Sequence, residues 1–303
     1  MGMSRRIRFV PERSLVEITC RTMQGRFLLR PSRRLKRRII GVLSRAQELY
    51  EVEIHAFTYL SNHCHLLITV DDAEQMARFM NYVQSNVARE AGRLAQWREK
   101  FWGRRYQAIL VTEEESAQLS RMDYVLAQGC KEGLVAKPQD WPGAQSTHAL
   151  LHDKDEIEGE WVNRTAQYQA QQRGADASVE RFVERRVVKL TPLPCMVAWR
   201  PEDRLEWFRE RVGHIAETQR RRGERPLGRE GIMKQDRHGR PSTSARSPAP
   251  LVHAATRRSA RQFHEAYKRF VAVYREACGK LPEFGPVGFP QRCFPPALPF
   301  VVT

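Results

Sequence analysis

Two histidines separated by a single residue are the first feature of this chain that could do chemistry. His63 and His65 stand in the stretch SNHCHLLI, residues 61–68, and an aliphatic run follows them. If this stretch is a strand, alternate residues face opposite sides of it, so the two imidazoles share one face. Their Cα atoms would then lie about 7 Å apart, which lets both rings bind one metal ion. Two ordinary half-exposed histidines are the alternative interpretation.

A tyrosine and a glutamine later in the chain could complete such a site. Tyr124 and Gln128 are four residues apart, so on a helix they lie on one face. That face differs from the apolar one formed by Leu119, Met122 and Leu126. This arrangement predicts a tyrosine nucleophile beside a third metal ligand. The alternative is a helical tyrosine that buries its ring and leaves its hydroxyl in water.

The hydrophobic periodicity around these residues predicts an α+β fold. The expected elements are a strand or bent hairpin over 15–29, a helix over 35–50, strands over 53–60 and 63–70, a helix over 72–94, a strand over 105–111 and a helix from 113 to about 132. This order is that of the ferredoxin-like, split βαβ arrangement, in which two helices cover one face of an antiparallel sheet. The tyrosine-bearing helix follows the last strand. The other face of the sheet, which those two helices leave uncovered, is the expected place for a site.

The strand that carries the histidines has one wholly apolar face. Cys64, Leu66, Ile68 and Val70 alternate with the histidines and are expected to pack against the two helices. His63 and His65 would therefore point to the open face of the sheet.

The remainder of the chain is expected to form a second region. We place a catalytic domain at 1–150 and a mostly helical, basic accessory region at 151–303. Helical spacing of apolar residues runs from Leu205 to Ile215 and from Phe263 to Tyr274. Between these helices, residues near 223–253 are rich in Gly, Pro, Ser and Arg, which predicts a flexible segment.

The charge balance favours a polyanionic partner. Lys and Arg number 51 against 35 acidic residues, which gives a formal net charge of +16 and a pI near 10.1. Nucleic acid is the commonest such partner, and an acidic membrane surface is the alternative. The N-terminus lacks the apolar segment of a secretory signal, and no apolar run is long enough to span a membrane. Six scattered cysteines without a C-x-x-C pair predict a cytoplasmic protein with free thiols.

These residues together resemble the HUH-type single-tyrosine transposases, in particular the REP-associated tyrosine transposase group. The matching stretches are NHCHLL at 62–67, FWGRRY at 101–106, and Tyr124 followed by GLV at 133–135 and WP at 141–142. The resemblance covers roughly residues 5–147. Two positions depart from the family pattern. Gln128-Gly129 stands where many relatives have Asn-Pro, and Cys64 replaces a larger apolar residue, which leaves zinc capture open.

The resemblance implies a metal-dependent enzyme that cleaves and rejoins single-stranded DNA. Tyr124 would attack a backbone phosphorus and form a 5′-phosphotyrosine. His63, His65 and Gln128 would hold a divalent metal, Mg²⁺ or Mn²⁺. The substrate would be single-stranded DNA with hairpin structure, and both a monomer and a homodimer remain open. A non-catalytic or domesticated nucleic-acid-binding protein on the same fold is the alternative function.

Basic residues near these motifs are the expected DNA contacts. Arg104 and Arg105 lie between Trp102 and Tyr106, so stacked bases and bound phosphates are expected there. Lys131 follows Tyr124 by two helical turns on the same face. Arg33, Arg34 and Arg37 belong to a dense run at the start of the first helix, which would bind phosphates of a hairpin stem. A solvated charged face is the alternative for this run.

Overall fold

The computed structural model describes residues 7–241, 250–284, 287–291 and 293–294. The named strands are β1 (Ser14–Arg21), β2 (Glu53–Tyr59), β3 (His63–Val70), β4 (Gln107–Val111), β5 (Glu156–Val162), β6 (Val183–Lys189) and β7 (Val252–His253). The α-helices are α1 (Arg33–Tyr50), α2 (Ala73–Ala95), α3 (Glu115–Leu126), α4 (Gln128–Lys131), α5 (Thr147–Leu150), α6 (Arg164–Gln172), α7 (Pro201–Arg221), α8 (Gly228–Lys234) and α9 (Arg257–Phe284).

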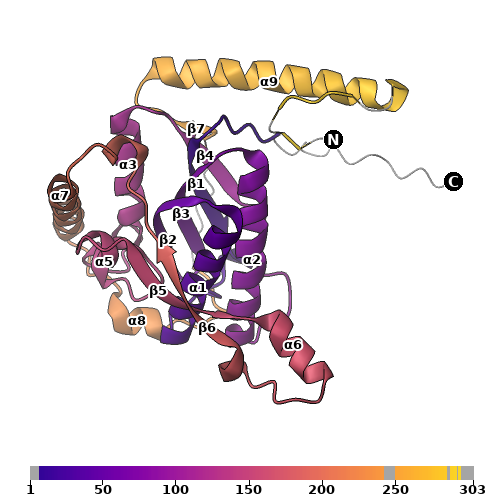
Figure 1. Cartoon of the computed structure of the whole chain (residues 1–303). Coiled ribbons are helices and arrows are strands. Elements are labelled where there is room, and N and C mark those ends of the chain that lie inside the picture. The colour runs from indigo at the N-terminus through magenta and orange to yellow at the C-terminus, as the bar shows by residue number, and fades with distance from the viewer. Residues whose placement is uncertain (1–6, 242–249, 285–286, 292, 295–303) are drawn as a thin grey trace.

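The central sheet has the strand order β2-β3-β1-β4-β7, with α1 and α2 packed on one face (Figure 1). Strands β1 to β4 pair antiparallel with one another. This is the topology of the ferredoxin-like fold, so the predicted α+β class and split βαβ arrangement are confirmed. The predicted first strand was too long, because β1 ends at Arg21 and the chain then turns through a short 3-10 helix at Met23–Gly25.

Local sequence signals explain where the two helices begin. The hydroxyl of Ser32 accepts a hydrogen bond from the backbone N–H of Leu35, 3.1 Å away, and so caps α1. The carboxylate of Asp72 does the same for Gln75 at the start of α2, at 2.7 Å. Apolar residues of α1, α2 and the inner face of the sheet, Cys64 included, then form one buried core.

The second face of the sheet is covered over part of its area, in contrast to the open face that the sequence suggested. Leu15, Leu67 and Val111 from the sheet pack with residues of α3 and α7 in a second buried core. The sequence could not show this, because α7 lies far along the chain and packs only through long-range contacts. The histidine end of β3 remains beside this covered area.

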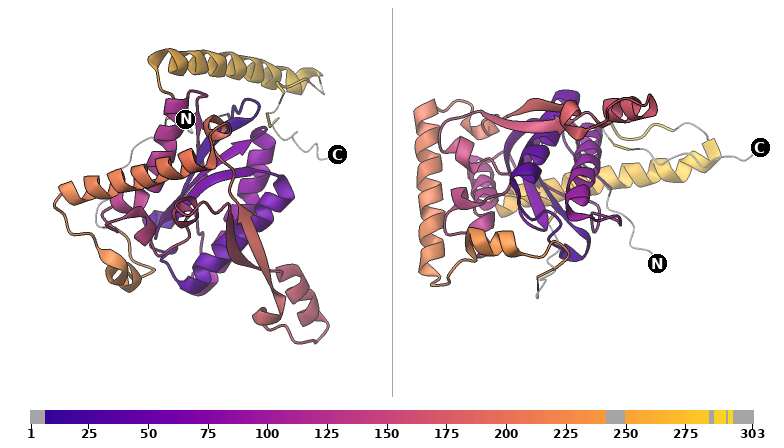
Figure 2. Two further views of the ribbon diagram at one scale, coloured as in Figure 1. Left: turned by 60° about the vertical axis from the view of Figure 1, so that its left-hand side comes forward. Right: turned by 90° about the horizontal axis from the view of Figure 1, so that it is seen from below.

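The chain after residue 150 is mostly helical, as expected, but it also contains an unexpected hairpin. Strands β5 and β6 pair antiparallel and pack across α1, and α6 lies beyond their tip (Figures 1 and 2). Gly41 of α1 and Gly159 of β5 touch there: a Cβ on Gly41 would lie 2.2 Å from the carbonyl carbon of Glu160. Only glycine allows α1 and the hairpin to approach this closely.

The segment expected to be flexible contains regular structure. Helix α8 lies within 223–253, and β7 adds a parallel strand to the edge of β4. Residues 242–249 of this segment lie outside the described residues. Across the described ranges, no helix combines the length and apolar character needed to cross a membrane.

Candidate active site

His63 and His65 lie side by side at the start of β3, on the face opposite Cys64. Their ring centroids are 5.2 Å apart, and the ring planes meet at 78°. Cys64 is buried in the core between the sheet and the helices, so its thiol points away from the two rings. The strand periodicity therefore places the imidazoles as the sequence suggested, and the thiol is not part of their site.

A buried carboxylate fixes the orientation of the His65 ring. Oε1 of Glu17, in the neighbouring strand β1, lies 2.7 Å from Nδ1 of His65. Glu17 is fully buried, and His65 is 5% exposed. A carboxylate can only accept a hydrogen bond, so Nδ1 of His65 carries a proton and Nε2 is the nitrogen left for another partner. An outer carboxylate of this kind is the usual partner of a metal-binding histidine.

An amide plays the same part for His63. Nδ1 of His63 lies 2.6 Å from Oδ1 of Asn62, and the amide nitrogen of Asn62 donates to the carbonyl of Gly25 at 3.1 Å. That second bond fixes which end of the amide faces the ring, so His63 donates through Nδ1 and leaves Nε2 free. Burial lowers the pKa of His63 to about 3, helped by the positive charges of His65, Arg21 and Lys131. The ring is therefore neutral at pH 7.

Helix α3 brings Tyr124 against these histidines. The Tyr124 ring centroid is 5.6 Å from that of His65, and the two planes meet at 74°. Two cations flank the phenol: the Lys131 ammonium lies 4.3 Å from the ring centroid, and the Arg121 guanidinium carbon lies 4.9 Å from it. Tyr124 is half-buried and Lys131 is exposed, so solvent reaches this side of the ring.

Arg121 also connects the tyrosine to the buried carboxylate. Its Nη1 lies 2.7 Å from Oε2 of Glu17. The two groups form an ion pair, but their geometry is not that of a hydrogen bond. Glu17 thus contacts His65 with one oxygen and Arg121 with the other. Both partners are almost fully buried, so each depends on the other for compensation of its charge.

Gln128 is buried one turn after Tyr124, in α4. Its amide nitrogen donates to the carbonyl oxygen of Tyr124 at 2.9 Å, which leaves Oε1 as the atom able to bind a cation. Among the described residues no hydrogen bond joins Gln128 to either histidine. The structure therefore brings His63, His65 and Tyr124 together directly and places Gln128 behind the tyrosine.

The donor atoms present are chemically suited to a divalent cation. In both imidazoles Nδ1 is engaged and Nε2 is the nitrogen left for a metal ion, which is the usual arrangement of a histidine ligand. Within the described ranges no cluster of three or more His, Cys, Asp or Glu residues could hold a metal ion. A site at the histidine pair would therefore need a further oxygen donor, and Gln128 can supply one.

Arg104 and Arg105 are exposed and precede β4 at the histidine end of the sheet. Gln107, two residues later, pairs with Thr19, which in turn pairs with His65. The two neighbouring aromatic rings differ in exposure, since Trp102 is half-buried and Tyr106 is buried. The Trp102 indole donates to the Gln84 carbonyl at 2.9 Å, and Tyr106 is buried beneath Arg8.

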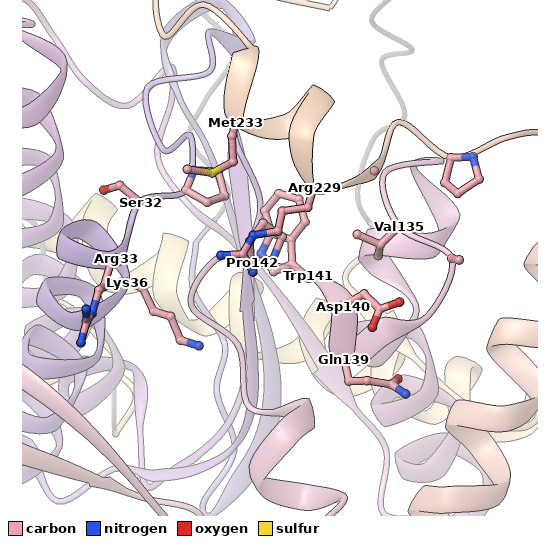
Figure 3. A pocket seen from close by; sticks show the side chains of 14 residues that line it. Ser32, Arg33, Lys36, Val135, Gln139, Asp140, Trp141, Pro142, Arg229 and Met233 are labelled. Atoms are coloured by element: carbon pink, nitrogen blue, oxygen red, sulfur yellow. The ribbon is translucent and has the colours of Figure 1, made fainter.

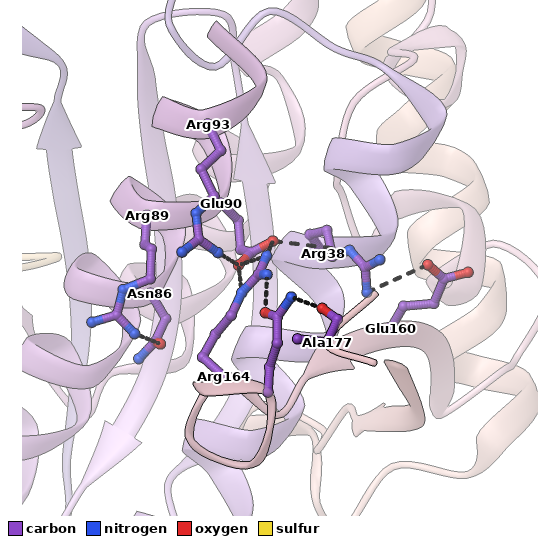
Figure 4. Close-up of polar contacts among 9 residues, drawn as sticks. Arg38, Asn86, Arg89, Glu90, Arg93, Glu160, Arg164 and Ala177 are labelled. Atoms are coloured by element: carbon purple, nitrogen blue, oxygen red, sulfur yellow. Dashed lines mark hydrogen bonds and ion pairs between the residues drawn. The ribbon is translucent and has the colours of Figure 1, made fainter. Parts of the chain in front are cut away.

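The arginine run at the start of α1 divides between solvent and ion pairs. Arg33 and Arg34 are exposed, whereas Arg37 pairs with Glu160 of the hairpin at 2.7 Å. Arg38 is buried and lies near Glu90 and Glu160, within a network that also includes Arg164 (Figure 4). Part of the run therefore attaches α1 to the chain beyond residue 150.

The sequence analysis missed Glu17 and Arg121. Glu17 is the only charged residue in the run SLVEITC of β1, and this lone acid in a buried strand was an available signal. Buried carboxylates are rare unless they are paired. Its partners stayed hidden, because they depend on the register between β1 and β3 and on where α3 docks.

The fold and the site together define a class of protein: a ferredoxin-like domain whose sheet presents two histidines to a tyrosine on a following helix. Residues 18–128 match a family model described as transposase IS200 like. This match covers 111 of the 303 residues, so the similarity to IS200-like transposases concerns this part of the chain. The matched span contains Glu17's two partners and all the candidate ligands, and stops before α5.

Two solved structures are similar to parts of the chain. One is a REP-associated tyrosine transposase bound to a REP hairpin, 16% identical, with a TM-score of 0.42 over 50% of this chain and 86% of that one. The other is a protein assigned as a transposase from Deinococcus radiodurans R1, 14% identical, with a TM-score of 0.28 over 39% of this chain and 95% of that one. The search of curated proteins gives no match.

Proposed function

We propose that this protein cleaves single-stranded DNA and transfers the strand, with Tyr124 as nucleophile. The observation that carries the proposal is the contact of the Tyr124 ring with His65, 5.6 Å between centroids, on the partly exposed side of α3. A nucleophile must stand beside the groups that stabilise the transition state, and this phenol does.

The proposed reaction is an exchange of phosphodiester bonds. The phenol oxygen of Tyr124 forms a bond to phosphorus and loses its proton, while the bond from phosphorus to the 3′ oxygen breaks. The 3′ oxygen takes up a proton and leaves as a hydroxyl, and the 5′ phosphate stays on the tyrosine. Attack by a second 3′-hydroxyl reverses these steps and releases Tyr124. The bond energy is conserved, so no external energy source is required.

We assign His63, His65 and Gln128 as the ligands of a divalent metal, Mg²⁺ or Mn²⁺. When bound, such an ion polarises the scissile phosphate and offsets the negative charge that develops on it. Glu17 and Asn62 hold the two imidazoles in the tautomer that keeps each Nε2 unprotonated. These two residues are therefore positioning residues for the metal ligands.

Lys131 and Arg121 are proposed to assist the nucleophile. Lys131 is exposed and lies over the Tyr124 ring, so its ammonium can bind a phosphate oxygen beside the phenol. Arg121 is buried against Glu17 and keeps a positive charge beneath the same ring. Arg104 and Arg105 then hold the strand where it passes the edge of the sheet.

We further propose a functional division of the chain, with catalysis in 1–150 and added DNA affinity from 151–303. The division concerns function only, because α7 and β7 pack into the cores of the N-terminal part. The substrate is proposed to be single-stranded DNA that carries a hairpin.

The polarity of the covalent linkage tests this function. A hairpin oligonucleotide is labelled at its 5′ end in one reaction and at its 3′ end in another, with Mn²⁺ present. We expect only the 3′ label to migrate with the protein, and the released 5′ fragment to be extendable by a polymerase. A protein-bound 5′ label, or cleavage without any protein-bound label, would refute the proposed chemistry.

A further inference from the structure

A basic hollow lies beside the start of α1, outside the histidine site (Figure 3). It has a volume of about 740 Å³. Three segments form its walls: the first turn of α1, residues 135–142 after the tyrosine helix, and residues 226–233 around α8. The last two of these segments lie outside residues 18–128, which match the IS200-like transposase model.

Three cations from two walls line this hollow without compensation. Arg33, Lys36 and Arg229 are exposed, and none of their side chains forms an ion pair or a hydrogen bond with any described residue. Lys36 and Arg229 project from facing walls (Figure 3). Partial burial lowers the pKa of Lys36, and the nearby charge of Arg229 lowers it further. One acidic residue, Asp140, lines the same hollow, so the net charge of its lining is positive and attracts an anion.

The hollow continues along α1 toward the hairpin. A second hollow of about 450 Å³ shares Arg33 and Lys36 with the first and adds Arg185 of β6, which is exposed and unpaired among the described residues. Its acidic residues are Glu158 and Glu160, and Glu160 is already bound by arginines of α1. We call the two hollows together the basic groove, defined by Arg33, Lys36, Arg185 and Arg229.

The groove is joined to the tyrosine site by backbone hydrogen bonds. The N–H groups of Leu227 and Gly228 donate to the carbonyls of Gly133 and Leu134, both at 2.9 Å. These carbonyls follow Lys131, whose ammonium touches the Tyr124 ring. Helix α8 and its Arg229 are therefore fixed directly to the end of the segment that carries the nucleophile.

We propose that the basic groove binds the phosphate backbone of the DNA on one side of the cleaved bond. The inference rests on the proposed function and extends it. Arg185 of the β5–β6 hairpin and Arg229 of α8 would add a second DNA contact, which residues 18–128 alone do not form. A row of unpaired cations, held by α8 to the segment that follows the nucleophile, suits successive phosphates of one strand. Phosphate contacts of this kind position a nucleic acid without reading its sequence.

The test compares Lys36→Gln/Arg229→Gln with the wild-type chain. A matched control, Arg200→Gln/Lys280→Gln, removes the same charge from exposed positions that already pair with Asp203 and Glu276. Binding is measured by fluorescence anisotropy at several salt concentrations, in a Tyr124→Phe background, with a hairpin DNA and with an unstructured single strand. Thermal melting verifies that each variant folds.

We expect the groove variant to bind hairpin DNA about tenfold more weakly at 0.15 M salt, with a salt slope lower by roughly 1.4–1.8. The control should remain within about twofold of the wild type. If the groove variant binds both DNAs more weakly, the groove holds a single strand. If it binds only the hairpin DNA more weakly, the groove holds the duplex stem. When Tyr124 is left intact, the groove variant should form the covalent adduct at the wild-type rate once DNA is saturating.

The opposite results separate the two proposals. If the groove variant matches the control with both DNAs while the wild type binds and cleaves, the groove inference is wrong and the proposed function stands. If the wild-type chain binds neither DNA, the proposed function fails and the groove inference fails with it.

Discussion

Oε1 of Glu17 lies 2.7 Å from Nδ1 of His65, inside a sheet where neither side chain meets bulk solvent. The other carboxylate oxygen lies 2.7 Å from the guanidinium of Arg121, which in turn packs on the Tyr124 ring. One buried acid therefore links a candidate metal ligand to the candidate nucleophile.

Replacement of Glu17 by Gln should weaken metal binding. A neutral amide holds the His65 ring less firmly and withdraws the charge that raises its basicity, and outer partners of this kind are worth about 10- to 100-fold in metal affinity. Mn²⁺ titration followed by electron paramagnetic resonance measures the loss without any DNA.

The Glu17→Gln change also leaves Arg121 with an uncompensated charge, so its effect on folding needs a control. The double variant Glu17→Gln/Arg121→Gln removes both charges. Its Mn²⁺ affinity should stay as low as that of the single variant, whereas its melting temperature should recover. Wild-type Mn²⁺ affinity in a folded Glu17→Gln protein would show that this carboxylate does not support the metal site.

His55 should make the fold less stable as the pH falls. It is fully buried, with Nδ1 2.9 Å from the carbonyl of Thr191 and Nε2 2.8 Å from the hydroxyl of Thr69. Burial lowers the pKa of His55 from its ordinary 6.5. The unfolded chain therefore binds a proton below pH 6.5 that the folded protein does not yet accept, so stability is complete above that pH and is lost below it.

Urea unfolding between pH 8 and pH 5 measures this dependence. One such proton contributes at most about 1.4 kcal/mol per pH unit. His55→Gln should be less stable at pH 8 but should show a flatter decline toward pH 5. An unchanged slope in that variant would assign the decline to other groups.

Gly41→Ala should separate the hairpin from α1. The new Cβ would lie 2.2 Å from the carbonyl carbon of Glu160, and a backbone carbonyl cannot move away without displacing β5. We expect a loss of more than about 2 kcal/mol in the free energy of unfolding. Gly213→Ala in α7 is the matched control, because its Cβ would meet no atom within 4 Å and a helical alanine is favoured by up to about 1 kcal/mol. Equal stability of the two variants would show that the contact at Gly41 is not tight.

Much of the fold followed from the sequence because its periodicity is local. The alternation of HCHLLITV determines which side of β3 is buried, and this alone places His63 and His65 together on the opposite face. The spacing of Tyr124 and Gln128 likewise predicted that they lie one turn apart, although Gln128 is buried and belongs to the separate helix α4. These features need no knowledge of distant contacts.

The parts that the sequence did not reveal depend on long-range pairing. Arg38 stands in the same basic run as Arg33 and Arg37, but it is buried and lies near Glu90 of α2 and Glu160 of β5. The strands EIEGEWV and VERRVVK mix charged with apolar residues, so neither has a clear strand pattern. The hairpin that they form packs on α1 at Gly41, a contact between residues far apart in the sequence. The groove at Arg229 arises from the same long-range packing.

The central claim is that Tyr124 forms the covalent bond to DNA, and the most direct measurement is the yield of protein–DNA adduct on a hairpin single strand with Mn²⁺. Tyr168→Phe, at an exposed tyrosine of α6, serves as the matched control. The account predicts a full adduct from the wild type and from Tyr168→Phe, and none from Tyr124→Phe that has folded and bound the DNA. An adduct of wild-type yield from Tyr124→Phe would contradict it.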